Sequence, residues 1–301
     1  MKIDFAALAK DSGYLCFDVE FDAQRTQPFA AGFMIHGCGF SSFDGKEVVT
    51  DYITDQEEIK RIVDATFQDN KVQIIAHNAK FDLNCLKRAN LYPGDPINLR
   101  CSMVGYNILD GNLQSSDYGL KPTILRDYGH KMEDYKTAAA KGLGTEQFYK
   151  YANEDVYWEL KLYMDMEDRL KRFWDLYTKI LMPSLLAFSD MECFGMYWDI
   201  EQAEDFYQEL YLARERLEKK IFEKIGRVNL NSSQQLGSRL FTELGYTTKY
   251  STKGKNGHWC LDAKVLDQLA RHYPVCNWIR AYRSCEKLIG TYLEPAYRHG
   301  S

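Results

Sequence analysis

The segment from Tyr14 to Phe21 constrains the fold of this chain most strongly. Its sequence, Tyr-Leu-Cys-Phe-Asp-Val-Glu-Phe, alternates and is rich in aromatic and β-branched residues, which is typical of a β-strand. The apolar runs at residues 29–35 and 46–52 are further strand candidates, and a short buried strand is expected at 72–76. Because strands come first and then alternate with helices, the pattern predicts an α/β domain built on a sheet.

Three stretches in this part of the chain have helical patterns. Residues 56–67 carry apolar side chains at helical spacing, and Thr54 is the expected N-cap. Helices are also expected after the strand at 72–76, over residues 81–89, and over residues 146–172.

Near Asp175 the pattern changes to mostly helix. Residues 201–225 have apolar side chains at spacings of three and four, with Asp199 to cap the start and Gly226 to end the helix. Such a helix is about 38 Å long, so a long antiparallel arm is expected. Another helix is expected from Asn231 to Gly245, and the polar, basic and glycine-rich residues 249–258 are typical of a loop.

We therefore predict two domains, residues 1–174 and residues 175–301. The charge is also divided unevenly. Residues 226–301 contain 11 Lys/Arg and 5 Asp/Glu, a net charge of +6, whereas residues 1–225 have a net charge of −11. The total of −5 argues against a general polyanion binder, but the asymmetry is compatible with a basic module joined to an acidic one.

Membrane insertion is not expected. No apolar run approaches the ~20 residues that a membrane helix needs, and the N-terminal sequence has no apolar signal-peptide core. We expect a cytoplasmic protein without a membrane partner.

Asp18 and Glu20 stand two residues apart on the first strand. Alternation along a strand puts both side chains on one face, a few ångströms apart, where their charges repel. A bound divalent cation is one reason to keep such a pair. The alternative is a strand whose other face is exposed to solvent and carries no site.

Two further acidic positions have comparable settings. Asp82 enters the first turns of the helix after the strand at 72–76, and Asn78 lies at the turn. Tyr151 and Asp155 are four residues apart, which stacks them on one helix face. Each has an ordinary alternative, because acids are favourable near helix N-termini, Asn78 can be a simple cap, and tyrosine is abundant in this chain.

The three acidic positions together predict a metal site. Four converging carboxylates suit hard divalent cations, which take oxygen ligands. Two such ions about 3.5–4 Å apart can activate a water and stabilise the leaving oxygen of a phosphodiester. Tyr151 adds a hydroxyl that can hold the attacking water. Neither a Ser-His-Asp arrangement nor a glycine-rich phosphate loop competes with this interpretation.

These residues resemble the three exonuclease motifs of the DEDD superfamily. The motifs are Phe-Asp-Val-Glu-Phe at 17–21, His-Asn-Ala-Lys-Phe-Asp at 77–82 and Tyr-Ala-Asn-Glu-Asp at 151–155. A tyrosine four residues before the last aspartate marks the tyrosine subtype. In the histidine subtype a histidine would stand five residues before Asp155, and here that residue is Lys150.

The resemblance extends over nearly the whole chain, to bacterial DNA polymerase I and its phage relatives in polymerase family A. Residues 119–131 resemble the segment between the second and third exonuclease motifs, and residues 182–199 the segment that opens the polymerase domain. Residues 229–237 and 282–292 resemble parts of the thumb. The resemblance implies a ribonuclease H-like exonuclease domain, a mainly helical thumb, and the cytoplasm of a bacterium or of a phage-infected host.

The chain also departs from the family pattern. It contains no His-Asp-Glu triplet, no Asp-Tyr-Ser palm motif and no fingers helix, so we do not expect it to polymerise DNA alone. At residues 99–103 the chain has Leu-Arg-Cys-Ser-Met, where relatives often have an acidic residue before Thr-Met. This difference is expected to affect helix packing near the site, but it removes no metal ligand.

By the resemblance, the first domain hydrolyses the terminal phosphodiester of a single-stranded DNA 3′ end. Asp18 would bridge two metal ions, Glu20 and Asp155 would complete the site of the ion that activates water, and Asp82 would hold the second ion. Tyr151 and Glu20 would orient the water. Mg²⁺ is the expected ion, with Mn²⁺ as a substitute.

The thumb-like region would bind duplex DNA through backbone contacts, and Asn78 is a further candidate beside the exonuclease site. Each candidate has an ordinary alternative, because Asn or Ser before a helix is usually a cap and loop lysines are usually solvated. The candidates in the second region are Asn231, Ser232, Ser233, Thr252, Lys253, Lys255, Lys287 and Thr291.

Two other functions stay open. A ribonuclease D-like exoribonuclease shares the Tyr-x-x-x-Asp motif, but compact helical RNA-binding domains would be expected after it. Alternatively, the chain is a DNA-binding, proofreading subunit of a split polymerase whose palm and fingers are on a separate polypeptide.

Overall fold

The structure is a computed structural model, and it divides the chain into two compact units, residues 1–195 and residues 196–301. Each unit is described by itself. The residues that the structure describes are 3–22, 33–111, 113–247, 249, 252–254 and 257–299.

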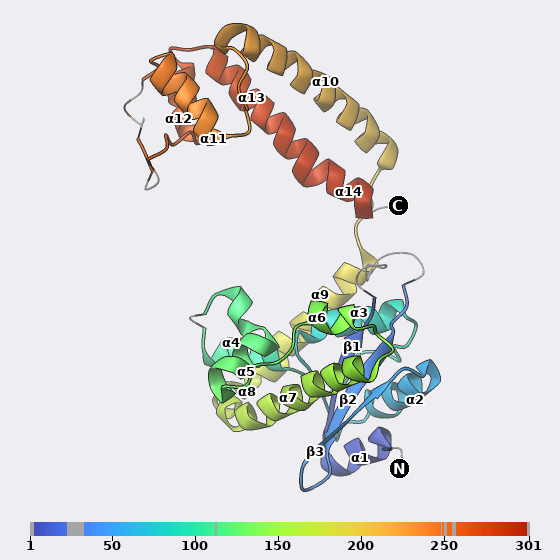
Figure 1. The fold of residues 1–301 in the computed structure, drawn as a ribbon. Coiled ribbons are helices and arrows are strands. Elements are labelled where there is room, and N and C mark those ends of the chain that lie inside the picture. Colours follow the sequence, from blue (N-terminus) through green and yellow to red (C-terminus); the bar gives the residue numbers. More distant parts are fainter. Residues whose placement is uncertain are drawn as a thin grey trace. The chain divides into compact units, whose positions relative to one another are not determined.

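The first unit is built on a five-stranded mixed sheet with the order β3-β2-β1-β4-β5 (Figure 1). The central strand β1 pairs antiparallel with β2 and parallel with β4, and β4 pairs parallel with β5. The strands are β1 (Tyr14–Glu20), β2 (Gly37–Phe43), β3 (Val48–Ile53), β4 (Gln73–Ala76) and β5 (Leu99–Cys101). This sheet with its flanking helices confirms the predicted α/β, ribonuclease H-like fold class.

The two faces of β1 are covered by different helices. On one face, Phe17 packs against Phe67, which follows α2 (Gln56–Thr66), with ring centroids 5.6 Å apart. On the other face lies the long helix α7 (Glu146–Leu170), which packs closely on β2 because Gly39 has no side chain. A Cβ atom at Gly39 would stand only 2.9 Å from Cγ1 of Val156. Helix α1 (Phe5–Ser12) contacts β2 as well, through Phe5 and Phe40.

Two local expectations are wrong in ways that the structure explains. Residues 33–35, the described part of the second apolar run, are not in a strand, and β2 begins at Gly37. The sequence of β2, Gly-Cys-Gly-Phe-Ser-Ser-Phe, has no alternation because it is buried on both faces. The cap of α2 is Asp55 rather than Thr54, since its carboxylate accepts a hydrogen bond from the Glu57 amide at 3.0 Å.

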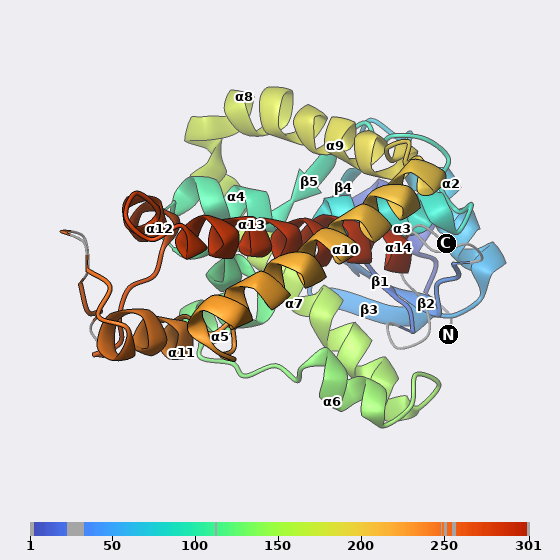
Figure 2. The same ribbon diagram turned by 90° about the horizontal axis from the view of Figure 1, so that it is seen from above.

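The remaining helices of the first unit complete its surface. Figure 2 shows α8, η3 and α9 as one almost continuous helical run. Helix α9 packs on α3, where Ser189 donates a hydrogen bond to Asn84 at 2.6 Å. The first unit therefore extends beyond the domain boundary that we predict at residue 174. These helices are α3 (Ala79–Arg88), α4 (Ser102–Leu109), η1 (Ser115–Tyr118), α5 (Leu120–Tyr128), α6 (Tyr135–Ala140), η2 (Lys171–Phe173), α8 (Trp174–Leu176), η3 (Tyr177–Leu181) and α9 (Met182–Phe194).

The second unit is helical, as predicted. Helix α10 (Ile200–Ile225) begins at the Asp199 cap, which accepts a hydrogen bond from the Gln202 amide at 3.0 Å, and ends at Gly226, whose φ is +79°. It packs against α13 (Val275–Leu288), alongside which it runs in Figure 1. Ile221 and Ile279 belong to one buried core. The other helices are α11 (Ser233–Gly237), η4 (Ser238–Glu243), α12 (Ala263–Ala270), α13 (Val275–Leu288), η5 (Ile289–Leu293) and α14 (Glu294–His299).

Within the described part of the chain, no helix has the length and apolar character needed to cross a membrane.

Candidate active site

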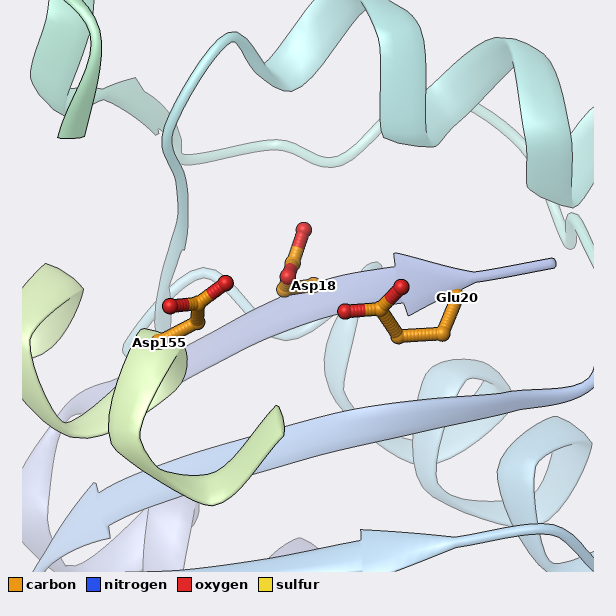
Figure 3. Close-up of side chains that lie close together, drawn as sticks. All are labelled: Asp18, Glu20 and Asp155. Atoms are coloured by element: carbon orange, nitrogen blue, oxygen red, sulfur yellow. The ribbon is translucent and has the colours of Figure 1, made fainter. Parts of the chain in front are cut away.

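Three carboxyl groups meet at the end of the central strand (Figure 3). Asp18 and Glu20 project from the same face of β1, and Asp155 projects toward them from α7. One carboxylate oxygen from each of the three lies within 4.8 Å of those of the other two. Because Gly39 lets α7 approach the sheet closely, residues more than 130 positions apart in sequence share one site.

Asp82 lies beside these three carboxyl groups and is not one of them. It lies in the first turn of α3, is 2% exposed, and accepts a hydrogen bond from the Val19 amide at 3.3 Å. Burial, and then the charge of Asp18, raise the pKa of Asp82 well above its usual value. Asp82 therefore lies close to Asp18, and its role as a ligand of a second metal ion stays a prediction.

The carboxyl groups of Asp18, Glu20 and Asp155 are strongly perturbed. Burial, and then the neighbouring charge of Asp155, raise the pKa of Asp18 to about 7. Burial raises the pKa of Asp155 to about 6, although Lys121 opposes the shift, and burial raises that of Glu20 well above its usual value. Without a cation, the folded protein therefore holds protons on this cluster at a pH where isolated carboxylates have lost them.

The donor set fits a hard divalent cation. Among the residues that the structure describes, Oδ1 of Asp155 and Oε1 of Glu159 are buried oxygens without a hydrogen-bond partner. Buried polar atoms are normally satisfied, and closely spaced carboxylates repel one another. A cation with oxygen ligands would relieve both costs at once.

The site opens into a pocket of about 490 Å³. Acids form one part of its wall, and the aromatic side chains of Phe21, Phe81 and Tyr135 form another. Phe81 is exposed and packs on Phe21, with ring centroids 5.8 Å apart. The full lining is Asp18, Val19, Glu20, Phe21, His77, Phe81, Gly119, Leu120, Lys121, Pro122, Tyr135, Tyr151, Asp155 and Glu159.

Tyr151 lines the pocket one turn before Asp155, and it stays protonated at neutral pH. Burial, and then the charges of Asp155 and Glu20, raise the pKa of its phenol above the usual value. Its hydroxyl accepts a hydrogen bond from Nζ of Lys121 at 3.1 Å. The phenol can therefore position a water or a phosphate oxygen, but it does not serve as a base.

Two pocket residues have ionisable side chains to which sequence reasoning assigned no role. Lys121 lies 3.3 Å from Oδ2 of Asp155. It belongs to residues 119–131, whose resemblance to family relatives implied no role for this lysine. Glu159 is 1% exposed and stands one turn after Asp155. Its signal was present, because Tyr151, Asp155 and Glu159 repeat every four residues along one face of α7.

Asn78 precedes α3 in a left-handed conformation, with φ +60°, and its side chain makes no capping hydrogen bond. It is thus not an ordinary side-chain cap.

Three candidate DNA-binding residues of the second unit have partners within the protein. Asn231 donates a hydrogen bond to Glu286 at 2.9 Å, and Ser232 caps α11 by accepting from the Gln235 amide. Lys253 lies over the ring of Trp259, with 4.9 Å from Nζ to the centroid. Ser233 begins α11, Thr252, Lys287 and Thr291 are exposed, and Lys255 lies outside the described residues.

Comparison with known proteins identifies the family of this chain. The family described as 3'-5' exonuclease matches residues 3–171, and DNA polymerase family A matches residues 200–300. The chain belongs to DNA polymerase family A and carries its 3′–5′ exonuclease domain. The five residues of the predicted exonuclease motifs, Asp18, Glu20, Asp82, Tyr151 and Asp155, all lie in the part that matches the exonuclease family.

Two curated relatives of this chain are bacterial DNA polymerases. It is 28% identical to DNA polymerase I of Rhizobium leguminosarum over 280 residues, which cover 88% of this chain and 27% of that protein. It is also 28% identical to DNA polymerase I of Chloroflexus aurantiacus, over 73% of this chain and 24% of that protein. The chain thus spans about a quarter of the length of these relatives.

A solved structure has the same fold. The POL domain of Pol1 from M. smegmatis, in complex with DNA primer-template and dNTP, aligns with a TM-score of 0.74 at 17% identity. The alignment covers 97% of this family A chain and 48% of that chain.

Proposed function

We propose that the first unit is a metal-dependent 3′–5′ exonuclease that hydrolyses the terminal phosphodiester at a single-stranded DNA 3′ end. The observation that carries the proposal is the meeting of Asp18, Glu20 and Asp155 within 4.8 Å at a pocket, with unsatisfied buried oxygens beside them. Membership of the 3′–5′ exonuclease family supports the direction of attack.

Asp18, Glu20 and Asp155 would hold a divalent cation, and Asp82 would share a second one with Asp18. When bound, Mg²⁺ or its substitute Mn²⁺ supplies positive charge that activates water and stabilises the leaving oxygen. The protein's own part is to place the reactants. The phenol of Tyr151 keeps its proton and orients the attacking water together with Glu20, while Phe21 and Phe81 line the wall of the pocket.

The polarity and substrate class can be tested with matched oligonucleotides. A 5′-labelled single-stranded DNA should be shortened stepwise from its 3′ end in Mg²⁺, and EDTA should stop the reaction. A DNA that is blocked by a 3′-terminal phosphorothioate should resist. Equal or faster degradation of the matching RNA would favour the ribonuclease D-like alternative instead.

The second unit is proposed to hold duplex DNA. Support comes from the surplus of six positive charges over residues 226–301 and from the fold that this chain shares with a polymerase solved on a primer-template. Such contact is mainly with phosphates, so affinity should fall steeply with salt.

A proofreading role within a polymerase assembly is a further prediction. The matches to the 3′–5′ exonuclease family and to DNA polymerase family A support such a role, and the partner would bear palm and fingers. Co-purification from the native source, or the neighbouring coding sequence, would identify such a partner. A 35.0 kDa chain that purifies alone would count against it.

A further inference from the structure

Lys121 places an ammonium group inside the carboxylate cluster. It is the second residue of α5, and its Nζ contacts three oxygens: the Glu133 carbonyl at 2.6 Å, the Tyr151 hydroxyl at 3.1 Å and Oδ2 of Asp155 at 3.3 Å. The same ammonium lies 4.2 Å from the centroid of the Tyr151 ring. The side chain is therefore held from several sides rather than loosely solvated.

This ammonium is the positive charge of the pocket. Among the described residues that line it, the other basic side chain is His77, and burial lowers the pKa of His77 to about 4, so it is neutral. The charge of Lys121 acts on Asp18, Glu20 and Asp155 together, because it opposes the rise in pKa of each. One lysine thus partly offsets the repulsion of three carboxyl groups.

The position of Lys121 conflicts with a cation on Asp155. A divalent ion that binds Oδ2 of Asp155 would share that oxygen with an ammonium 3.3 Å away, and two positive charges at such distances repel strongly where water is partly excluded. The carbonyl of Glu133 and the hydroxyl of Tyr151 offer the ammonium other partners that do not compete for the metal.

We propose that Lys121 is the counter-cation of the metal-free cluster and a positioning residue for the reaction. It holds Asp155 and Tyr151 in place until divalent cations displace it from Asp155. It then keeps its hydrogen bond to the Tyr151 hydroxyl, so that the hydroxyl hydrogen is left to donate elsewhere in the pocket. This inference rests on the proposed metal-dependent function.

The test is Mn²⁺ binding to the full chain without DNA, measured by electron paramagnetic resonance at pH 8.5, where protons compete least for the carboxylates. Lys121→Met should bind Mn²⁺ roughly threefold or more tightly than the parent, because a repulsive charge is gone. Lys121→Arg should stay near the parent. Lys141→Met is the matched control, since Lys141 pairs with the Glu133 side chain and does not line the pocket.

A second readout separates positioning from folding. At saturating Mn²⁺, Lys121→Met should degrade 3′ single strands at least about tenfold more slowly, since the Tyr151 hydroxyl has lost its partner. Tighter metal binding combined with slower turnover is not produced by a lysine that only supports the fold. If Lys121→Met is unstable without metal, Lys121→Gln replaces it in both measurements.

Unchanged or weaker Mn²⁺ binding by the neutral variants would overturn the proposal, and so would unchanged turnover. The failure of the proposed function has a different signature. In that case the parent itself would neither bind Mn²⁺ nor shorten DNA from its 3′ end.

Discussion

At the scale of single residues, the carboxyl cluster makes the stability of the metal-free protein depend on pH. The pKa of Asp18 is about 7 in the folded protein and 3.8 in an unfolded chain, so the folded state keeps a proton that the unfolded state has lost. The free energy of unfolding therefore falls as pH rises from about 4 to about 7. Asp155 acts in the same direction, with a folded pKa of about 6.

The contribution of this cluster should consequently make the metal-free protein more stable at pH 6 than at pH 8. Asp18→Asn removes part of the fall, and at pH 8 in EDTA it should raise the free energy of unfolding by about 1 kcal/mol or more, roughly 2–4 °C in Tm. Thermal denaturation followed by circular dichroism measures this. Asp64→Asn, at an exposed pair with Lys60, is the control, and a variant less stable than the parent at pH 8 would refute the prediction.

Tyr151 provides the second prediction at this scale. Tyr151→Phe removes the hydroxyl but keeps the ring under Lys121, so Mn²⁺ affinity should change little while turnover falls about tenfold to a hundredfold. Single-turnover assays at saturating metal measure the loss. Tyr157→Phe, more exposed on the same helix, should behave like the parent. Equal losses in the two variants would contradict the role of the Tyr151 hydroxyl.

At the scale of elements, the site depends on how closely α7 approaches β2. In Gly39→Ala the new Cβ would stand 2.9 Å from Cγ1 of Val156 and 3.2 Å from the Ala152 carbonyl, so α7 must move and carry Asp155 with it. We expect a loss of about 1–3 kcal/mol in unfolding free energy and a larger relative loss of exonuclease activity. Gly144→Ala, which meets no atom within 4 Å, is the control. Full activity in Gly39→Ala would contradict this account.

The elements also show what the sequence could and could not predict. Alternation in β1 predicted that Asp18 and Glu20 share a face, and helical spacing predicted that Tyr151 and Asp155 share another; both are seen. Strand β2 escaped prediction, because a strand buried on both faces by small residues has no period. The role of Lys121 was not predicted, because it depends on contacts with Glu133, which precedes α6, and with Tyr151 on α7, and no local pattern encodes these contacts.

At the scale of the whole molecule, an acidic nuclease and a basic helical unit share one chain. If residues 249–258 contact duplex phosphates, deleting them should weaken duplex binding more at 50 mM than at 300 mM salt, and should reduce the slope of log affinity against log salt. Fluorescence anisotropy with a labelled duplex measures both. The control is Lys264→Ser/Arg271→Ser, which removes two positive charges from the same unit outside the deleted segment. If the deletion leaves the slope of log affinity against log salt unchanged, the loop does not contact the duplex phosphates.

The central claim is that the acids at the end of β1 and on α7 form a metal-dependent exonuclease site, and one measurement tests it most directly. It compares the parent with Asp18→Ala/Asp155→Ala on a 5′-labelled DNA with a single-stranded 3′ end, in Mg²⁺, with folding of both proteins verified by circular dichroism. The double variant should be slower by at least about a hundredfold, because two cation ligands are lost. Degradation at the rate of the parent by a folded double variant would contradict the claim.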